Sequence, residues 1–210
     1  MSGRQLFEKH GKRIKALIKI AKLFPKSFRK NRLAAACMSR GKIGQLKRYI
    51  WISTLAKHVG ENVAIYPNVY FEHVEKLSLG SNVSIHQMCY IDAGGEIVIG
   101  NDVSIAHRTT VLSSNHRYSE QDTPIKYQGM IHDRTIIEEN VWVGCGVTIL
   151  AGVHIQSGSV VGANSVVTKD VGKDEIVAGN PSKFIKMRAS TSIGSSNIIE
   201  DMDQSKCENV

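Results

Sequence analysis

A six-residue repeat between Ile137 and Gly172 constrains the fold of this 210-residue chain more than any other feature. Each of its six blocks opens with a β-branched aliphatic residue: Ile137, Val143, Ile149, Ile155, Val161 and Val167. An α-helix has 3.6 residues per turn and does not fit this spacing, whereas short strands joined by turns do. Three strands and three corners would make one coil of eighteen residues. Hexapeptide repeats are an established signature of a parallel β-helix, and we predict that fold.

The same spacing extends toward the N-terminus in three triplets of blocks. These blocks open at Val59, Ile65 and Phe71, at Leu79, Ile85 and Ile91, and at Ile99, Ile105 and Val111. The step from one triplet to the next is eight residues, so we expect two extra residues at one corner of these coils, around 76–78 and 97–98. All fifteen openings are aliphatic except Phe71. A β-sandwich would show alternation without this six-residue period.

The repeat is interrupted after His116. Residues 117–135 are mostly polar, contain Pro124 and Gly129, and carry no repeat. A loop this long inside a regular solenoid is usually functional, and insertions in repeat proteins often project on the binding face. We therefore expect the interruption to contribute to a site.

The chain divides into four predicted parts. Residues 1–58 form a basic, largely helical segment, and residues 59–180 form the β-helix with its inserted loop. A short C-terminal helix is expected over 181–188, because Lys183, Lys186 and Arg188 lie at helical spacing. Residues 189–210 are Ser-rich and acidic, a composition typical of disorder.

Positive charge is concentrated in the N-terminal segment. Residues 1–58 contain sixteen Lys and Arg against one acidic residue, Glu8. Residues 4–24 have the spacing of an amphipathic helix, and Pro25 should end it. Such a segment can lie on an anionic membrane, at about 1 kcal/mol per basic residue, or cap the open end of the β-helix. The two roles are compatible. No nucleic-acid recognition motif accompanies the charge, so nucleic-acid binding is not expected.

Cysteine usage and hydropathy indicate a cytoplasmic protein. The four cysteines, Cys37, Cys89, Cys145 and Cys207, are scattered and have no paired metal spacing, as expected of reduced thiols. No run of about eighteen apolar residues predicts a membrane-spanning helix. No small-residue cleavage pattern follows an apolar run, as a secretory signal would require. We expect a cytoplasmic location, with peripheral contact at the inner membrane face.

Three runs of residues resemble the hexapeptide-repeat acetyltransferases. They read NVWVGCGVTILAGV (140–153), GSVVGANSVVTKDV (158–171) and IVAGNPSKFIK (176–186). The most similar branch contains the maltose, galactoside and nodulation-factor O-acetyltransferases and relatives encoded with surface-polysaccharide genes. The resemblance covers about residues 59–188. It implies a left-handed coil, an exception to the right-handed crossover rule. It also implies a homotrimer with active sites between subunits, acetyl-CoA as donor, and no metal.

The resemblance assigns catalytic roles to two residues. A sugar hydroxyl is a poor nucleophile at neutral pH, so its attack on a thioester needs a base, and imidazole suits this task. His116 aligns with the family's catalytic histidine, which implies that it takes the acceptor proton. The family match also implies that the backbone N–H of Cys145 donates a hydrogen bond to the tetrahedral oxyanion. The alternatives are a loop histidine without a role and an acyl-enzyme on the Cys145 thiol.

Further donor-site residues follow from the resemblance alone. They are Trp142 along the pantetheine channel, Gly162, Ala163, Thr168 and Lys169 at the adenosine end, and Lys183 and Lys186 near the 3′-phosphate. A cation is favourable beside a phosphate. The family often has Arg where this chain has Lys, and a Lys cannot form a bidentate contact. The alternatives are plain packing for Trp142 and a solvated helix face for the two lysines.

Two residues are candidates for contact with the acceptor. His86 stands where the sugar acetyltransferases have an Asn facing the acceptor, so it either binds the hydroxyl or shifts acceptor preference. Asp92 would orient an imidazole, or remain a surface carboxylate. No two histidines have the close spacing that β-helix carbonic anhydrases use for zinc, so metal chemistry is not expected.

The sequence thus predicts an acetyl-CoA-dependent O-acetyltransferase acting on a saccharide or lipid-linked glycan in capsule or O-antigen modification. Two alternatives remain open at this point. One is an acetyltransferase for an amine or amino-acid acceptor, such as an amino sugar or serine. The other is a non-catalytic β-helix that scaffolds other enzymes.

Overall fold

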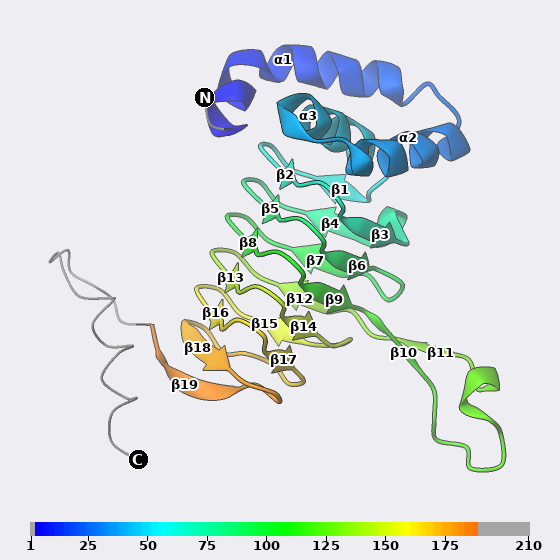
Figure 1. Cartoon of the computed structure of the whole chain (residues 1–210), viewed down its shortest axis with the longest axis vertical. Helices are drawn as coiled ribbons and strands as arrows, with labels where there is room; N and C mark the ends of the chain where they lie inside the picture. Colours follow the sequence, from blue (N-terminus) through cyan, green and yellow to red (C-terminus); the bar gives the residue numbers. More distant parts are fainter. Residues whose placement is uncertain (1–2, 189–210) are drawn as a thin grey trace, which may run out of the picture.

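The computed structural model describes the backbone of residues 3–188 and the side chains of residues 10–188. Three helices cover one end of a parallel β-helix (Figure 1). The helices are α1 (Gly3–Ala21), α2 (Lys26–Met38) and α3 (Gly41–Ile52). Pro25 directly precedes α2, where its fixed φ suits a helix start. The predicted tail of residues 189–210 lies outside the described residues.

The β-helix is left-handed, makes about six turns and has three sheets. Sheet A contains β1 (His58–Val59), β4 (Leu77–Leu79), β7 (Ile97–Ile99), β12 (Thr135–Ile137) and β15 (His154–Ile155). Sheet B contains β2 (Ala64–Ile65), β5 (Ser84–Ile85), β8 (Ser104–Ile105), β13 (Trp142–Val143), β16 (Val160–Val161), β18 (Glu175–Ala178) and β19 (Lys183–Met187). Sheet C contains β3 (Tyr70–Glu72), β6 (Tyr90–Asp92), β9 (Thr110–Leu112), β14 (Thr148–Ile149) and β17 (Val166–Val167). Successive strands within each sheet pair in parallel, except for β19.

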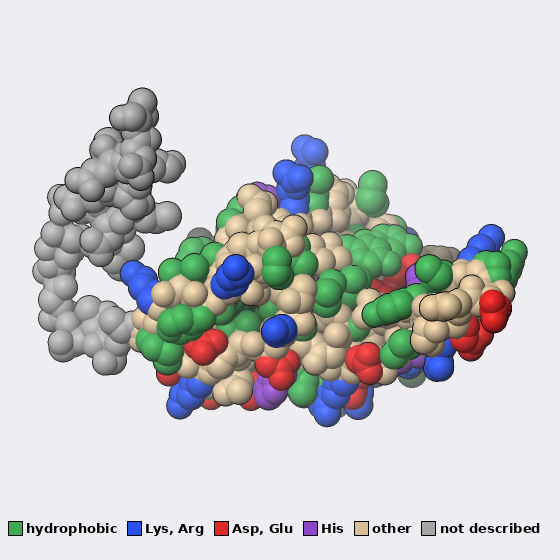
Figure 2. Space-filling model, turned by 90° about the horizontal axis from the view of Figure 1, so that it is seen from below, with side chains coloured by type: hydrophobic (Ala, Val, Ile, Leu, Met, Phe, Trp, Pro, Cys, Tyr) green, Lys and Arg blue, Asp and Glu red, His purple; other side chains and the backbone are tan. Residues whose placement is uncertain are grey.

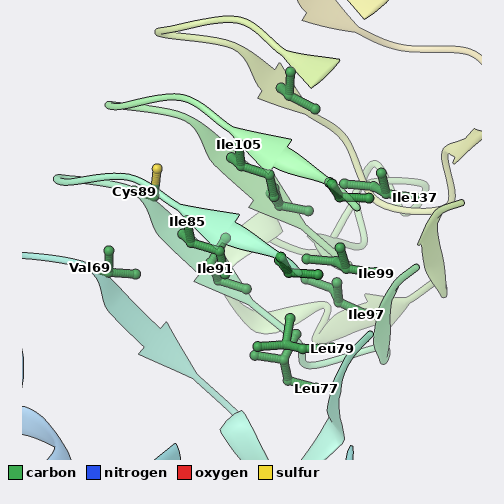
Figure 3. Packing of buried hydrophobic residues seen from close by; sticks show 14 of the residues in the cluster. Val69, Leu77, Leu79, Ile85, Cys89, Ile91, Ile97, Ile99, Ile105 and Ile137 are labelled. Atoms are coloured by element: carbon green, nitrogen blue, oxygen red, sulfur yellow. The ribbon is translucent and has the colours of Figure 1, made fainter. Parts of the chain in front are cut away.

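The block openings form the core, as the repeat predicts. From Ile65 onward every opening except Phe71 is buried, and the side chains stack inside the coil in ladders such as Ile85–Ile105 and Leu79–Ile99 (Figure 3). Val59 and Phe71, both in the first coil, are partly buried. Burial of each Ile or Leu contributes about 1.5–3 kcal/mol, so a polar residue at a block opening would destabilise the coil.

The extra residues of the first coils lie slightly earlier than the sequence predicts. They form the corner before β4, which contains the 3₁₀ turn η1 (Val74–Lys76), and the turn over residues 93–96 before β7. Residues 77–78 and 97–98 belong to strands, and Leu77 and Ile97 are fully buried. The expected positions are wrong because these two apolar residues extend the strands N-terminally by one inward-facing position.

The predicted short helix over 181–188 is also wrong. Lys183–Met187 form β19, which pairs antiparallel with β18 and has a bulge opposite Ile176 and Val177. The outer edge of β18 would otherwise present unpaired backbone groups at the last coil. Phe184 and Ile185 have strong β-propensity, so this pairing prevails over the helical spacing of the basic residues.

A buried arginine attaches the helical cap to the first coil. Arg48 of α3 is 1% exposed. Its Nε donates a hydrogen bond of 2.7 Å to the carbonyl of Ile65 in β2, and its Nη1 donates one of 2.8 Å to the carbonyl of Ala36 in α2. The neighbouring Cys37 thiol stays protonated, because burial raises its pKa to about 11. One side chain thus joins α2, α3 and the coil, and the N-terminal segment covers the end of the β-helix.

The interruption of the repeat forms a projecting hairpin, residues 114–132, called here the arm. It consists of β10 (Ser114–His116), the 3₁₀ turn η2 (Ile125–Tyr127) and β11 (Met130–His132), with β10 and β11 antiparallel. The arm extends away from the coil (Figure 1), and its Tyr118, Ile125 and Tyr127 are exposed. A lone two-stranded hairpin is only marginally stable in water, so this arm needs a surface to pack against.

Candidate functional site

His116 lies at the root of the arm. It is exposed and stands opposite Met130 in the β10–β11 pairing. Residues two apart in a strand share a face, so His116 faces the same side as Ser114. Ser114 is buried, and its hydroxyl donates a hydrogen bond to Asp92 Oδ2. The structure therefore brings the predicted base and the predicted acceptor carboxylate to one corner of the coil.

Asp92 is held in a network that sequence reasoning found only in part. Besides Ser114, the Gly94 N–H donates to its Oδ1 at 3.0 Å, and His73 Nδ1 lies 3.1 Å from the same oxygen. His73 was not singled out in the sequence. The eight-residue step is the signal that could have found it, because His73 occupies the extra corner residue directly before η1.

The network keeps Asp92 ionised. Burial alone would raise the pKa of this carboxyl group, but hydrogen bonds from Ser114 and Gly94 and the nearby His73 together hold its pKa below the ordinary value. An ionised Asp92 accepts hydrogen bonds from Ser114, at the start of the arm, and from the Gly94 N–H of the coil. This group therefore positions the arm, and the imidazole that it contacts is that of His73.

Replacement of Asp92 by Asn is expected to lower the free energy of unfolding by about 1–2 kcal/mol at pH 7, because charge-assisted hydrogen bonds are lost. A carboxyl group whose folded pKa is depressed contributes stability above its unfolded pKa, and that contribution is lost as the pH falls through the folded pKa. The difference in free energy of unfolding between the parent protein and Asp92→Asn should thus be constant above about pH 4 and shrink below it. Urea unfolding at stepped pH measures this. A difference that grows in acid would contradict it.

A second cluster lies at the corner between sheets B and C, called here the B–C corner. The second residue of each turn there forms a column: Pro67, Gln87, His107, Cys145 and Ala163. Backbone carbonyls of this column accept hydrogen bonds from the next turn. Gly146 N–H donates one of 2.9 Å to the His107 carbonyl, and Asn164 N–H donates one of 2.8 Å to the Cys145 carbonyl. Within residues 3–188 the structure gives the N–H of Cys145 no acceptor. This N–H is available for an oxyanion, as the resemblance implies.

Glycine at position 144 permits this close stacking of turns. A Cβ on Gly144 would lie 2.7 Å from the backbone nitrogen of Ala163 in the next coil. The Cys145 side chain is partly exposed and its sulfur is free. Cys89, which lies in the B–C corner turn after β5, is buried, and this burial raises the pKa of its thiol to about 11.

His86 occupies the same corner two coils earlier. Its ring stacks on Tyr66 with centroids 4.5 Å apart and an interplanar angle of 11°. Burial and the nearby His107 lower the pKa of His86, so this imidazole is neutral at pH 7 and can donate or accept a hydrogen bond. His107, which was not a site candidate in the sequence analysis, lies in the Cys145 column. Within the described residues no three His, Cys, Asp or Glu side chains are placed to hold a metal ion.

The outer face of sheet B carries the remaining donor-site candidates in one row. Trp142 of β13 is exposed and pairs with Val160 of β16. Val160 pairs with Ile176 of β18, and Ile176 pairs with Lys186 of β19. Side chains of directly opposite residues lie on the same face of a sheet. Lys183 stands opposite Ala178 and, because of the bulge, faces the same side as Lys186. The two lysines thus share the face of Trp142 although they are not helical.

The adenosine-end candidates lie in the last coils. Gly162 and Ala163 form the B–C corner turn after β16, and Ala163 is exposed. Thr168 and Lys169 are exposed at the other end of the same coil, directly after β17. This end of the molecule also exposes Phe184, Ile185 and Met187, and hydrophobic side chains are spread over it when it is viewed from below (Figure 2).

The two clusters lie at different corners of the coil. His116 and Asp92 follow the C-terminal ends of sheet C strands, whereas His86 and Cys145 precede the N-terminal ends of sheet C strands. The arm continues away from the B–C corner (Figure 1). Within one chain the base and the free N–H therefore do not face each other across a common cleft.

Comparison with known proteins gives a consistent picture. Residues 134–169 match the family model described as bacterial transferase hexapeptide (six repeats). The chain is 33% identical over 141 residues to a galactoside O-acetyltransferase of Escherichia coli strain K12, covering 67% of this chain and 68% of the relative.

Two solved structures extend the similarity to three dimensions. A galactoside acetyltransferase in complex with coenzyme A superposes with a TM-score of 0.69 at 30% identity, covering 78% of this chain and 81% of the other. A hexapeptide-repeat-containing acetyltransferase of Vibrio cholerae O1 biovar eltor, complexed with acetyl coenzyme A, has a TM-score of 0.69 at 27% identity and covers 83% and 88% of the two chains.

Proposed function

Because the chain belongs to the hexapeptide-repeat acetyltransferases, of the galactoside and maltose O-acetyltransferase type, we propose that it transfers the acetyl group of acetyl-CoA to a saccharide hydroxyl in surface-polysaccharide modification. The observation that carries this proposal is the alignment with a galactoside O-acetyltransferase over two thirds of both chains. The acceptor class follows from that alignment. We further place the reaction in capsule or O-antigen synthesis.

The donor side of the proposal rests on sheet B and the B–C corner. The exposed Trp142 and the basic Lys183 and Lys186 share one face, which suits a ligand with an extended arm and an anionic end. A lysine ammonium favours a phosphate group. We also assign Ala163, in the turn before β17, and the pair Thr168–Lys169, directly after β17, to the adenosine end of the donor site.

In the proposed mechanism His116 acts as the general base. Its imidazole accepts the proton of the acceptor hydroxyl while the hydroxyl oxygen attacks the acetyl carbonyl carbon. The N–H of Cys145 donates a hydrogen bond to the carbonyl oxygen as negative charge develops there. His116 then returns its proton to the leaving thiolate. Asp92 and Ser114 hold the arm root, and His86 in its neutral form contributes a hydrogen bond to the acceptor.

The proposed active unit is a homotrimer with sites between subunits. His116 and Cys145 lie at different corners of one chain, so a second copy is needed to place them at a common cleft. The projecting arm, with Tyr118, Ile125 and Tyr127 exposed, offers apolar contacts to that copy. Closed cyclic symmetry would give every subunit the same neighbour and hence identical sites.

An acceptor panel tests the proposal. We expect acetyl-CoA-dependent release of free thiol with a galactoside, a maltoside or an oligosaccharide, and no comparable rate with serine or an amino sugar whose hydroxyls are blocked. The neutral His86 in the place of an Asn is the observation that favours a narrower acceptor range than simple galactosides. Faster transfer to serine or to the amino sugar would favour the alternative of an amine or amino-acid acceptor. No release with any acceptor, from a folded oligomer, would favour a scaffold.

A further inference from the structure

Helix α1 has two apolar faces, and only one of them is used by the fold. Ile14 and Ala21 are buried, and Ile18 packs against the core, so this face attaches α1 to the rest of the cap. A second group of large apolar side chains is left exposed on α1, on the turn that follows it and at the start of α2. This group, called here the outer patch, consists of Leu17, Ile20, Leu23, Phe24 and Phe28.

The outer patch gathers five exposed apolar side chains within twelve residues of the chain. Leu23 is 84% exposed, Ile20 is 56% exposed, and the rings of Phe24 and Phe28 stack with centroids 5.0 Å apart. The α1 helix lies at the extreme end of the molecule, beyond α3 and the coil (Figure 1). Contiguous exposed apolar surface marks a site of interaction with another molecule or a membrane.

Cations outnumber acidic groups around the outer patch, where Glu75 lies 3.9 Å from Lys26 and Glu61 pairs with Lys15. No Asp or Glu occurs between Glu8 and Glu61. Lys19, Lys22 and Lys26 are exposed beside the patch, and the guanidinium of Arg32 lies 5.9 Å from the centroid of the Phe28 ring. An amphipathic helix with exposed apolar residues and flanking lysines is the arrangement that lies in the interface of anionic membranes.

We propose that α1 and the start of α2 dock on an anionic membrane surface, with Leu23, Phe24 and Phe28 entering the headgroup boundary and the flanking lysines contacting acidic lipid headgroups. None of the described helices is long and apolar enough to cross a membrane, so the contact is peripheral. The positive charge alone would also suit a nucleic acid. A nucleic-acid backbone binds through its phosphates, however, and would leave the five apolar side chains of the outer patch exposed.

The docked orientation has a consequence for the acceptor, which rests on the proposed function. The arm root follows the third coil below the helices. At about 4.8 Å per coil and about 10 Å for a helical layer, His116 lies roughly 25 Å from the membrane surface. The membrane-bound enzyme therefore reaches sugars distal to a lipid anchor and not those next to it.

Co-sedimentation of the full chain with vesicles tests the docking. Vesicles of phosphatidylcholine mixed with an equal part of phosphatidylglycerol should bind the protein, and vesicles of phosphatidylcholine alone should bind it at least tenfold more weakly. The double variant Leu23→Asp/Phe24→Asp should weaken binding at least tenfold. Each of Lys19→Ala, Lys22→Ala and Lys26→Ala should weaken it about fivefold. Lys173→Asp, which changes the net charge by the same two units at an exposed residue far from the helices, should leave binding unchanged.

The outcomes are separable. Unchanged binding of the outer-patch variant, equal binding to neutral vesicles, or an equal loss of binding in Lys173→Asp would overturn the proposal. So would tight binding of duplex DNA that is as sensitive to the patch variant as vesicle binding. The lysine variants keep the test valid if the double variant misfolds. Acetyl transfer to a soluble saccharide, measured on the same variants, should persist, so a failure of docking and a failure of the proposed function give different results.

Discussion

Replacement of His116 by Ala is expected to lower kcat for acetyl transfer at least about a hundredfold, because general-base catalysis contributes about 10²–10⁴-fold. The side chain is exposed on β10, and no described residue bonds to it, so its removal should leave the fold intact. KM for acetyl-CoA should change little, since His116 lies away from the Trp142 row. Steady-state rates of thiol release, together with the melting temperature and the oligomeric state, measure this.

Asn115→Ala provides the matched control for His116. Asn115 precedes His116 in the same strand and faces the opposite side of the arm, so its truncation changes the arm by a similar amount without touching the proposed base. Its kcat should stay within a few-fold of the parent protein. A His116→Ala protein that keeps more than a tenth of the parent rate would rule out His116 as the base. Equal losses in both variants would assign the effect to the arm's shape.

The core of this protein could be predicted because every coil repeats the same short pattern of residues along the chain. Each block opening takes an aliphatic side chain that points into the coil, so Ile85, Ile105 and Val143 repeat a local rule that is visible in the sequence. The same logic located the corners at which His86 and Cys145 lie. Reading a period needs no knowledge of which segment packs against which.

The features that sequence reasoning missed depend on contacts between neighbouring coils. Lys183–Met187 form a strand because the edge of β18 is open, and that edge exists only once the coil has formed. Asp92 is ionised and bound by His73 and Ser114, which come from a previous corner and a later strand. The direction of the arm is likewise set by the packing of its root. Side-chain spacing along one segment contains none of this information.

Replacement of Cys145 by Pro is expected to lower kcat about 10²–10³-fold, because removal of one oxyanion donor costs about 3–4 kcal/mol. Proline removes the backbone N–H that the structure leaves free. The chain itself indicates that the turn accepts proline, since Pro67 occupies the same position of the column in the first coil. The residue after each has a left-handed backbone, with φ of 59° at Asn68 and 68° at Gly146, so the two turns have the same shape.

Cys145→Ala separates the N–H from the thiol. Alanine keeps the backbone donor and removes the sulfur, so this variant should retain nearly the full rate if the N–H stabilises the oxyanion. A large loss in Cys145→Ala would instead point to an acyl-enzyme on the sulfur. If Cys145→Pro keeps the parent rate while remaining folded, the donor must be another group of the site.

Mixing the two inactive proteins extends this prediction to the assembly. His116 and Cys145 of one chain lie at different corners, so each proposed site combines His116 of one copy with Cys145 of its neighbour. A trimer that contains both His116→Ala and Cys145→Pro copies has some sites in which both groups are intact. Random reassembly of equal amounts should therefore restore activity at roughly a quarter of the sites, whereas sites built within one chain would restore none. Reassembly after reversible dissociation, followed by rate measurement, distinguishes the two, because neither variant has activity to contribute by itself.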